Sequence, residues 1–305
     1  MAGVSKRKKI LAGVSGGRDS MVLLHALATL GFKNLVVCHL DHTLRGRSST
    51  ADARLVLREA GRMGFPVEHA RVPTLDYAAS EKKSLELAAR ELRHTFFQKC
   101  ALRTKAHTLV LAHTADDQVE TCLFNFLRGS GAAGIGGMRP LAQLGGLAVY
   151  RPLLAVPRAG IDRYRALHRV AFREDATNAG LHHTRNKLRH QVLPVLGEVM
   201  GESFRGAILR AAEILRAEEE WMASLVPEVT DTLDCGQLRA MAPALRSRTV
   251  RRWLRQLGVP ECGLSETRLV LSLLDPATGP AKINLPGDFH ARRRAGLVFL
   301  EGRPG

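Results

Sequence analysis

Aromatic and acidic side chains are both scarce in this chain of 305 residues. Phe, Trp and Tyr make up 5% of it, which argues against an open platform that stacks single-stranded bases. Asp and Glu number 29 against 45 Lys and Arg, which gives a net charge of +16 with neutral histidines. A field of this sign attracts polyanions, so nucleic acid is the leading partner, and a solvated basic surface is the alternative.

Cysteine pairs and long apolar runs are also missing. The five cysteines, at positions 38, 100, 122, 235 and 262, include no C-x-x-C pair. This argues against metal–thiolate and redox dithiol sites, and the odd count fits a reducing compartment. No apolar run near the N-terminus has the length of a signal or membrane helix. We therefore expect a cytoplasmic protein with no membrane segment.

Short apolar runs alternate with amphipathic stretches in the first half of the chain. Runs rich in Val and Leu predict strands at 10–14, 34–39, 66–72 and 108–113. Apolar residues at helical spacing predict helices at 21–30, 51–63, 84–102 and 115–127. This alternation predicts an α/β fold, a Rossmann-like, doubly wound parallel sheet with helices on both faces.

The second half has a different pattern. A further strand is predicted at 147–150, and helical spacing follows from residue 158 to about 274, including 186–196 and 201–225. The tail, 281–300, predicts a β-hairpin around Pro286 and Gly287. We expect a catalytic domain at 1–197 and a smaller, mostly helical domain at 198–305 that ends in this hairpin.

The strongest motif is GVSGGRDS at residues 13–20, between the first strand and the first helix. A loop at this junction directs backbone N–H groups at an anion, and the helix dipole adds positive potential. The motif has neither the lysine of a Walker A loop nor the G-x-G-x-x-G of dinucleotide-binding folds. We predict a phosphate site formed by Ser15, Gly16, Gly17, Arg18, Asp19 and Ser20. Asp19 either caps the helix or holds Mg²⁺.

Polar side chains follow two other predicted strands, and ligands bind at the carboxyl ends of strands in open α/β sheets. The second strand ends at His39, with Asp41, His42 and Arg45 just beyond it, and the fourth ends at His113, with Asp116, Asp117 and Glu120 just beyond it. The simpler interpretations are hydrogen-bonded histidines and acidic residues that complement a helix dipole. The functional interpretation is a site for a base, for Mg²⁺ or for a substrate ammonium group.

Basic residues form a third set of candidates. Arg90 lies one helical turn from Glu86 and from His94, which indicates either surface ion pairs or a cationic ridge facing phosphate. The remaining candidates are Arg128, which begins a Gly-rich stretch at 128–138, and three residues at the start of a basic helix, Arg185, Asn186 and Arg189.

The loop at 13–20 resembles the signature of the PP-loop ATP pyrophosphatases, which split ATP between its α and β phosphates. Further motifs follow in order: HLDHTLR (39–45), ARELRH (89–94), AHTADDQVET (112–121), LRGSGAAGIGGM (127–138) and TRNKLR (184–189). Together they resemble the tRNA(Ile)-lysidine synthases, closely over 9–196 and loosely beyond. Thr114 and His94 depart from the family, which usually has histidine and tyrosine at these positions.

The resemblance implies a reaction with ATP, Mg²⁺, free L-lysine and a tRNA(Ile) with a CAU anticodon. The C2 oxygen of the wobble cytidine is adenylated, and the lysine amine then displaces AMP, giving lysidine and changing the codon read from Met to Ile. A lysine amine with a pKa of about 10.4 costs roughly 4–5 kcal/mol to deprotonate at pH 7. The resemblance implies Asp41, Asp116, Asp117 and Arg185 as catalytic residues, and which of the three carboxylates accepts the proton stays open.

It further implies substrate contacts by His39, His42, Arg45, Arg90, His113, Glu120, Arg128, Asn186 and Arg189. The second domain is expected to bind the tRNA backbone through arginines at 246, 248, 251, 252 and 292–294. Rival functions are a tRNA thiolase, a non-catalytic RNA-binding module and an amidotransferase-coupled synthetase. The sequence leaves open how tRNA(Ile) is distinguished from tRNA(Met), and whether the chain is a monomer or a homodimer.

Overall fold

The computed structural model describes residues 4–44, 47–173, 184–275 and 277–302. The chain divides into two compact units, 1–214 and 215–305, which meet within the helix α10 (Ser203–Ser224). The division into a catalytic domain at 1–197 and a smaller domain at 198–305, which the sequence patterns indicated, stays a prediction.

The first unit contains a six-stranded sheet whose strand order is β3-β2-β1-β4-β6-β5. Its strands are β1 (Ile10–Gly13), β2 (Leu35–Asp41), β3 (Val67–Arg71), β4 (Thr108–Val110), β5 (Leu141–Leu144) and β6 (Leu147–Tyr150). All neighbours are parallel except β5, which runs antiparallel to β6. The predicted parallel sheet is confirmed, and the antiparallel edge strand is an addition that the sequence patterns did not reveal.

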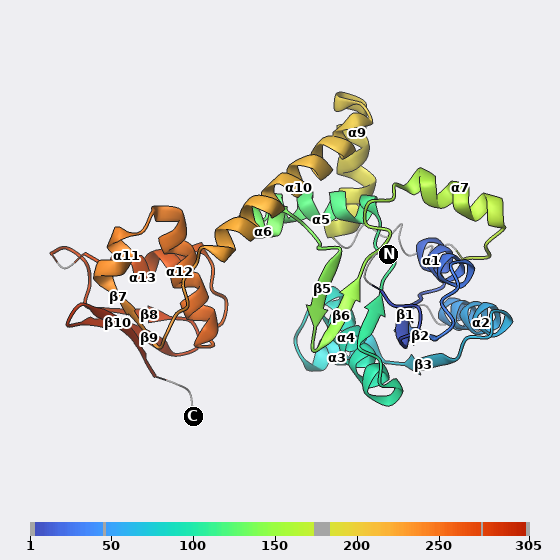
Figure 1. Cartoon of the computed structure of the whole chain (residues 1–305), viewed down its shortest axis with the longest axis horizontal. Helices are drawn as coiled ribbons and strands as arrows, with labels where there is room; N and C mark the ends of the chain where they lie inside the picture. The colour runs from blue at the N-terminus through green and yellow to red at the C-terminus, as the bar shows by residue number, and fades with distance from the viewer. Residues whose placement is uncertain (1–3, 45–46, 174–183, 276, 303–305) are drawn as a thin grey trace. The chain divides into compact units, whose positions relative to one another are not determined.

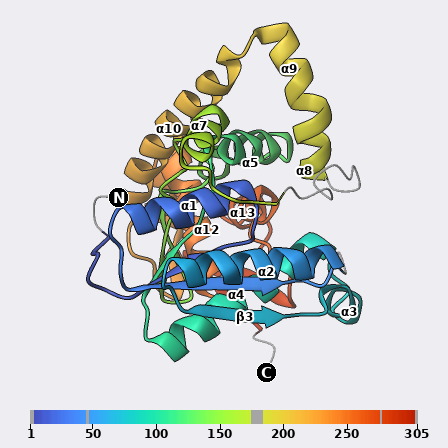
Figure 2. The ribbon, with the colours of Figure 1, turned by 90° about the vertical axis from the view of Figure 1, so that its right-hand side faces the viewer.

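Helices cover both faces of this sheet (Figures 1 and 2). They are α1 (Arg18–Thr29), α2 (Arg47–Arg62), α3 (Thr74–Ser80), α4 (Leu85–Thr104), α5 (Ala115–Leu127), α6 (Ala132–Ile135) and α7 (Arg158–His168). Alternate residues of β1 separate the two faces, as the pleat of a strand requires. Ile10 and Ala12 share a buried cluster with side chains of α1, α2 and α7, whereas Leu11 packs in a cluster with α4.

The strand order places the carboxyl ends of β1 and β4 next to each other. Chain connections from β1 proceed through β2 to β3 on one side, and β4 then pairs with β1 on the other. Such a reversal opens a crevice at the strand ends, where ligands bind in doubly wound folds. The loop at 13–20 and the segment that begins at residue 111 therefore face the same crevice.

A continuous helical stretch begins at Thr184, where the description of the chain resumes after residue 173. It consists of α8 (Thr184–Lys187), the π-helix η2 (Leu188–Val192) and α9 (Leu193–Met200), and α10 comes next. Wide π turns are rare and occur often at functional sites.

The second unit combines three helices with an antiparallel sheet of order β7-β10-β9-β8. Its elements are β7 (Thr232–Asp234), α11 (Cys235–Ala240), α12 (Pro243–Gln256), α13 (Leu264–Ser272), β8 (Lys282–Leu285), β9 (Phe289–Arg294) and β10 (Leu297–Glu301). The predicted hairpin is confirmed, because Leu285 pairs with Phe289 across Pro286 and Gly287. The strand β7 lies within residues 158–274, which were expected to be helical. It forms because Leu233 pairs with Val298 of β10 and joins the buried core, a contact between residues far apart in the chain.

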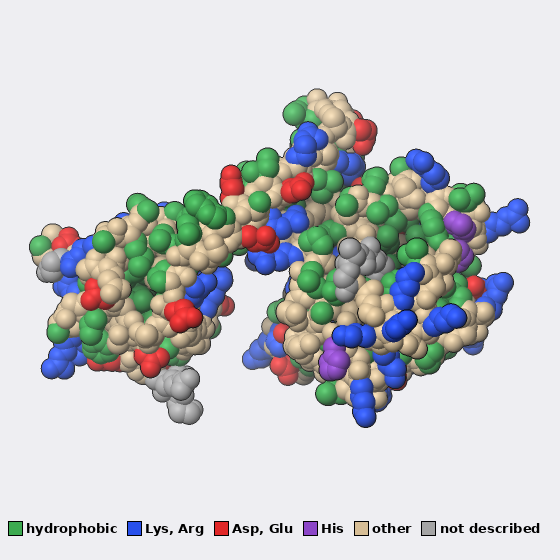
Figure 3. All heavy atoms as spheres, viewed as in Figure 1, with side chains coloured by type: hydrophobic (Ala, Val, Ile, Leu, Met, Phe, Trp, Pro, Cys, Tyr) green, Lys and Arg blue, Asp and Glu red, His purple; other side chains and the backbone are tan. Residues whose placement is uncertain are grey.

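The surface is rich in positively charged side chains. Figure 3 shows Lys and Arg side chains spread over the viewed face of each unit. Within the part of the chain that the structure describes, no helix has both the length and the apolar character needed to cross a membrane.

Candidate active site

The turn at residues 14–17 leaves the N-terminus of α1 open. The backbone N–H of Ser15 donates to Ser20 Oγ at 3.1 Å, and the Ser20 hydroxyl donates to the Gly17 carbonyl at 2.9 Å. Gly17 is the N-cap, and no side chain caps the helix there. The first N–H groups of α1 are therefore directed at the crevice, where the helix dipole favours an anion.

Gly16 allows the close approach of a second chain segment to this turn. Its φ is +91°, and a Cβ at this position would lie 3.3 Å from Cβ of Asp52. From the other side, the backbone N–H of Arg173 donates to the Gly16 carbonyl at 3.1 Å. The Arg173 guanidinium pairs with Asp52 at 2.8 Å, and the Asp52 side chain is 6% exposed. Asp52 and Arg173 hold the turn in place, and no local motif in the sequence identified them.

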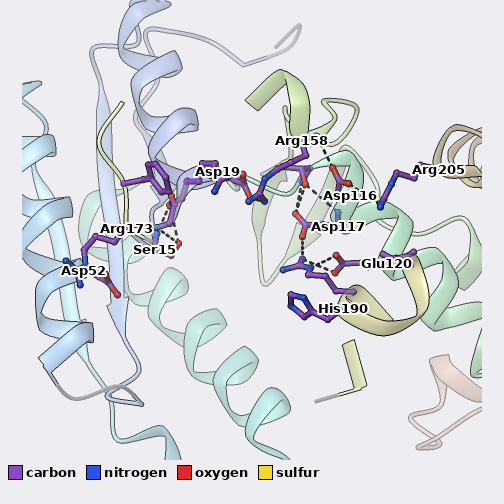
Figure 4. Close-up of a pocket in the computed structure, with 18 of the residues that line it drawn as sticks. Ser15, Asp19, Asp52, Asp116, Asp117, Glu120, Arg158, Arg173, His190 and Arg205 are labelled. Carbon is purple, nitrogen blue, oxygen red and sulfur yellow. Dashed lines mark hydrogen bonds and ion pairs between the residues drawn. The ribbon is translucent and has the colours of Figure 1, made fainter. Parts of the chain in front are cut away.

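A cavity of about 790 Å³ lies at this crevice (Figure 4). Its walls include Ser15 and Asp19 from the α1 side and Asp117 and Glu120 from the α5 side, together with Arg205 of α10. The structure thus brings together the phosphate loop and the acidic motif, which are about a hundred residues apart in the chain.

The carboxylate of Asp116 contacts two later helices. Its Oδ2 accepts a hydrogen bond from the backbone N–H of Arg158 at 2.9 Å, which is the first residue of α7, and its Oδ1 lies 3.4 Å from Arg205 Nη1. Figure 4 shows Asp116 between Arg158 and Arg205. Its two oxygens thus join the start of α7 to α10 at the wall of the cavity, which Asp116 also lines.

Thr114 and Asp117 form a capping box at the start of α5. The Thr114 N–H and hydroxyl donate to Asp117 Oδ2 at 2.8 and 3.1 Å. This arrangement gives the family departure at Thr114 a structural role, because a threonine hydroxyl caps a helix well. Asp117 Oδ1 remains directed into the cavity, toward Arg189 at 3.2 Å.

Glu120 forms a bidentate ion pair with Arg189 of η2. Arg189 Nε donates to Oε1 at 2.5 Å, and Nη2 donates to Oε2 at 2.9 Å. The Glu120 side chain is 8% exposed. Burial raises the pKa of Glu120, and the hydrogen bond and charge of Arg189 oppose this effect. Asp117 and Glu120 therefore share one guanidinium at the wall of the cavity (Figure 4).

Gln118 connects two of the sequence motifs. Its Nε2 donates to the carbonyls of Gly136 and Met138 at 3.3 and 3.0 Å, and its Oε1 accepts from the Met138 N–H at 2.8 Å. Gly137, with φ of +69°, lies so close that a Cβ would be 2.7 Å from Gln118 Nε2. The glycine-rich stretch is therefore attached to α5 and is not a freely closing loop.

Asp19 fits a magnesium ion. Its Oδ1 is buried without a hydrogen-bond partner, and burial raises the pKa of the carboxyl while the charge of Arg158 lowers it. Mg²⁺ is usually held by one or two carboxylates together with substrate phosphates and water. No cluster of three or more His, Cys, Asp and Glu suited to a metal occurs among the described residues.

Three of the residues predicted at the end of β2 lie in the described part of the chain, and these three, His39, Asp41 and His42, have partners of their own and are not in the cavity lining. Asp41 is buried, and its carboxylate accepts from Arg71 Nε at 3.0 Å and from the Thr43 N–H at 2.8 Å. His42 Nδ1 lies 2.9 Å from the Thr74 hydroxyl, and burial followed by the charge of Arg93 lowers its pKa to about 4. Arg45 lies outside the described residues.

His39 is a buried histidine that is hydrogen-bonded to the backbone. Its Nδ1–H donates to the Val14 carbonyl at 2.8 Å, and its ring stacks on His69. Burial lowers the pKa of His39. The side chain therefore supports the strand that leads into the phosphate turn.

A cationic group lies beside His113. Burial lowers the pKa of His113 to about 4, and nearby Arg151, Arg93 and Arg185 add to this effect. Arg93 lines the cavity, and burial followed by the charges of Arg90 and Arg185 lowers its pKa. Arg93 is in the helix motif that carries Arg90, but its place on the cavity wall could not be read from the spacing.

The Phe124 ring contacts two of the predicted arginines, Arg128 and Arg185. The guanidinium carbons of Arg128 and Arg185 lie 5.3 and 5.4 Å from the centre of its ring, within the range of cation–π contacts. Arg185 also pairs with Glu86 at 3.4 Å. Asn186 lies next to Arg185 in α8, outside the cavity lining.

Two family models match the chain. The PP-loop domain matches residues 2–196, and the TilS substrate binding domain matches residues 233–299. The fold of the U34-tRNA thiolase from Methanococcus maripaludis is similar, with a TM-score of 0.53 and 16% identity over 69% of this chain and 72% of that one.

Proteins named tRNA(Ile)-lysidine synthase are similar in sequence. The one from Solibacter usitatus is 36% identical over 92% of this chain and 64% of its own length. The one from Geobacter sulfurreducens is 38% identical over 72% of this chain and 46% of its own length. The one from Clostridium acetobutylicum is 30% identical over 97% of this chain and 67% of its own length. The chain thus spans about half to two thirds of these relatives and belongs to the tRNA(Ile)-lysidine synthase family of PP-loop proteins.

Proposed function

We propose that the protein uses ATP to join L-lysine to C2 of the wobble cytidine of a tRNA(Ile) with a CAU anticodon. The observation that carries this proposal is the cavity that joins an anion site and an amine site. The open N-terminus of α1 suits phosphates, and Asp117 with Glu120 suits an ammonium group.

In the first step, the C2 oxygen of cytidine attacks the α-phosphorus of ATP. A P–O bond forms, the bond to the β-phosphate breaks, and pyrophosphate leaves. The N–H groups at the start of α1 and the Ser15 hydroxyl bind the phosphates and stabilise the charge that develops on them. Asp19 would hold Mg²⁺, which supplies charge neutralisation to the phosphates when it is bound.

In the second step, the lysine Nε attacks C2, the C2–O bond breaks, and AMP leaves. The amine must lose its protons during this step, and a carboxylate within reach must accept one. Of the carboxylates that the sequence offered, Asp116 and Asp117 line the cavity, whereas Asp41 is held outside its lining by Arg71 and Thr43. Asp117 lies beside Glu120, with which it shares Arg189, whereas Asp116 pairs with Arg205. We assign Asp117 to binding the amine and accepting its proton, with Glu120 beside it.

In this proposal, arginines near the cavity bind phosphates of the tRNA. Arg93 lines the cavity, Arg185 lies within electrostatic reach of Arg93, and Arg128 contacts the same Phe124 ring as Arg185. These three guanidinium groups suit the phosphates of the nucleotides around the wobble base. In the second unit, Arg248 pairs with Glu219, and Arg252 donates to backbone carbonyls. Arginines such as Arg251 and Arg294 remain as candidates for contacts to the tRNA backbone. A tRNA substrate places the reaction in the cytoplasm.

Mass analysis of tRNA nucleosides tests this proposal. Incubation of tRNA(Ile) with ATP and isotope-labelled lysine should convert its wobble cytidine into a labelled nucleoside heavier by one lysine residue. Asp117→Asn should still release pyrophosphate but lose most lysine transfer, and Asp76→Asn, a change in α3 away from the cavity, should behave like the wild type. Pyrophosphate release with no lysine in the product would refute the ligase proposal.

A further inference from the structure

Arg189 occupies the position where a substrate ammonium is expected. Its guanidinium contacts both oxygens of Glu120 and Oδ1 of Asp117, while Thr114 engages the remaining Asp117 oxygen. Every carboxylate oxygen of the proposed amine site therefore already has a donor from the chain. An incoming lysine competes with this internal cation for the same acceptors.

The same side chain lies within electrostatic reach of the phosphate site. Arg189 interacts with the charge of Asp19 in the first turn of α1, and both side chains line one cavity. A nucleotide at α1 brings several negative charges to this place. Guanidinium groups bind phosphate oxygens in the same bidentate manner as carboxylates, so the nucleotide offers Arg189 an alternative partner.

The backbone that carries Arg189 is an unusual one. Residues 188–192 form the π-helix η2 between the α-helical segments α8 and α9. Such turns are rare and occur frequently at functional sites. Arg189 thus lies on a segment of the kind that often carries functional side chains.

We propose that Arg189 blocks the amine site until nucleotide phosphates draw it away, so that lysine binds tightly only after ATP. The inference rests on the proposed function, because it takes lysine as the second substrate. An ordered entry of this kind keeps the amine away until the reactive adenylate can form. It assigns Arg189 a part in the order of binding, whereas a contact to substrate was all that the sequence implied.

Calorimetry of lysine binding tests the inference, with and without an ATP analogue whose α–β bridge is a methylene group. For the wild type we expect the analogue to tighten the lysine Kd by about tenfold, within the usual range of coupling between sites. In Arg189→Met, lysine should bind without nucleotide about as tightly as it binds to the nucleotide-loaded wild type. Arg189→Lys, which retains a cation that fits only one carboxylate at a time, should keep part of the coupling.

Arg205→Gln provides the matched control. It removes another cavity guanidinium, the one paired with Asp116, and should leave the tenfold effect of nucleotide in place. Circular dichroism of each variant verifies its fold. If Arg189→Met and Arg189→Lys bind lysine more weakly than the wild type in both states, Arg189 positions the carboxylates and the inference is overturned.

The outcomes separate the two proposals. Lysine binding to the wild type that does not depend on nucleotide refutes the blocking role and leaves the proposed ligase intact. A wild type that binds no lysine in any state, and incorporates none into tRNA, refutes both.

Discussion

Gln118 offers a direct measure of how firmly the glycine-rich stretch is attached to α5. The side chain is 2% exposed, and replacing it by the similarly shaped Met removes its three hydrogen bonds. The N–H and carbonyl of Met138 and the carbonyl of Gly136 then lose their hydrogen bonds to this side chain. At about 1 kcal/mol for each bond, the free energy of unfolding of the first unit should fall by about 3 kcal/mol.

The positions of the two tryptophans allow the unfolding of the second unit to be followed separately. Both tryptophans, Trp221 and Trp253, lie in the second unit, so tryptophan fluorescence follows that unit alone. In a urea titration, Gln118→Met should shift the transition seen by circular dichroism and leave the tryptophan transition in place. Gln118→Glu should be at least as harmful, because a carboxylate oxygen would face two carbonyls. A loss below about 1 kcal/mol in both variants would refute the proposed attachment.

Three further predictions concern other parts of the molecule. Gly16→Ala should weaken nucleotide binding by about tenfold in calorimetry, since a side chain at positive φ costs about 1–2 kcal/mol and its Cβ would crowd Asp52. His113 has a pKa of about 4 when folded and an ordinary pKa when unfolded, so the unfolded chain binds more protons between these values. Stability in urea should therefore fall as the pH is lowered from about 6.5 to about 4, and His113→Asn should reduce this slope. Arg252→Gln should lower the stability of the second unit by about 1–2 kcal/mol, seen by tryptophan fluorescence, because its guanidinium donates to three carbonyls at the end of α10 and just after it. Arg255→Gln should leave that transition unchanged.

The sequence predicted the local backbone around the site. The turn before α1 and the start of α5 depend on residues that are neighbours in the chain, and the structure has a turn and a helix start at these places. Five of the six strands in the first sheet were also predicted, because buried strands form short apolar runs. The strand β5 escaped, since its half-exposed sequence at the sheet edge lacks that pattern.

Long-range pairing was beyond the reach of the sequence patterns. Asp41 and Asp117 both follow buried strands, yet Asp41 pairs with Arg71 on the neighbouring strand while Asp117 faces the cavity. Which of them is available depends on strand order, and nothing in the spacing reveals that order. The same holds for Arg173 and Arg205, which reach the site from later elements. The π-helix has no known sequence pattern that a single chain would reveal.

Two helices begin at the cavity, and they give it opposite electrical poles. The dipoles of α1 and α5 both present a positive end there, but α1 leaves its N–H groups open, whereas Thr114 and Asp117 close the start of α5 with a carboxylate. The start of α1 therefore presents open N–H groups and positive potential to the cavity, and the start of α5 presents a carboxylate that is paired with Arg189. Along one cavity wall the sign of the local charge thus reverses between two helix ends that have the same backbone polarity.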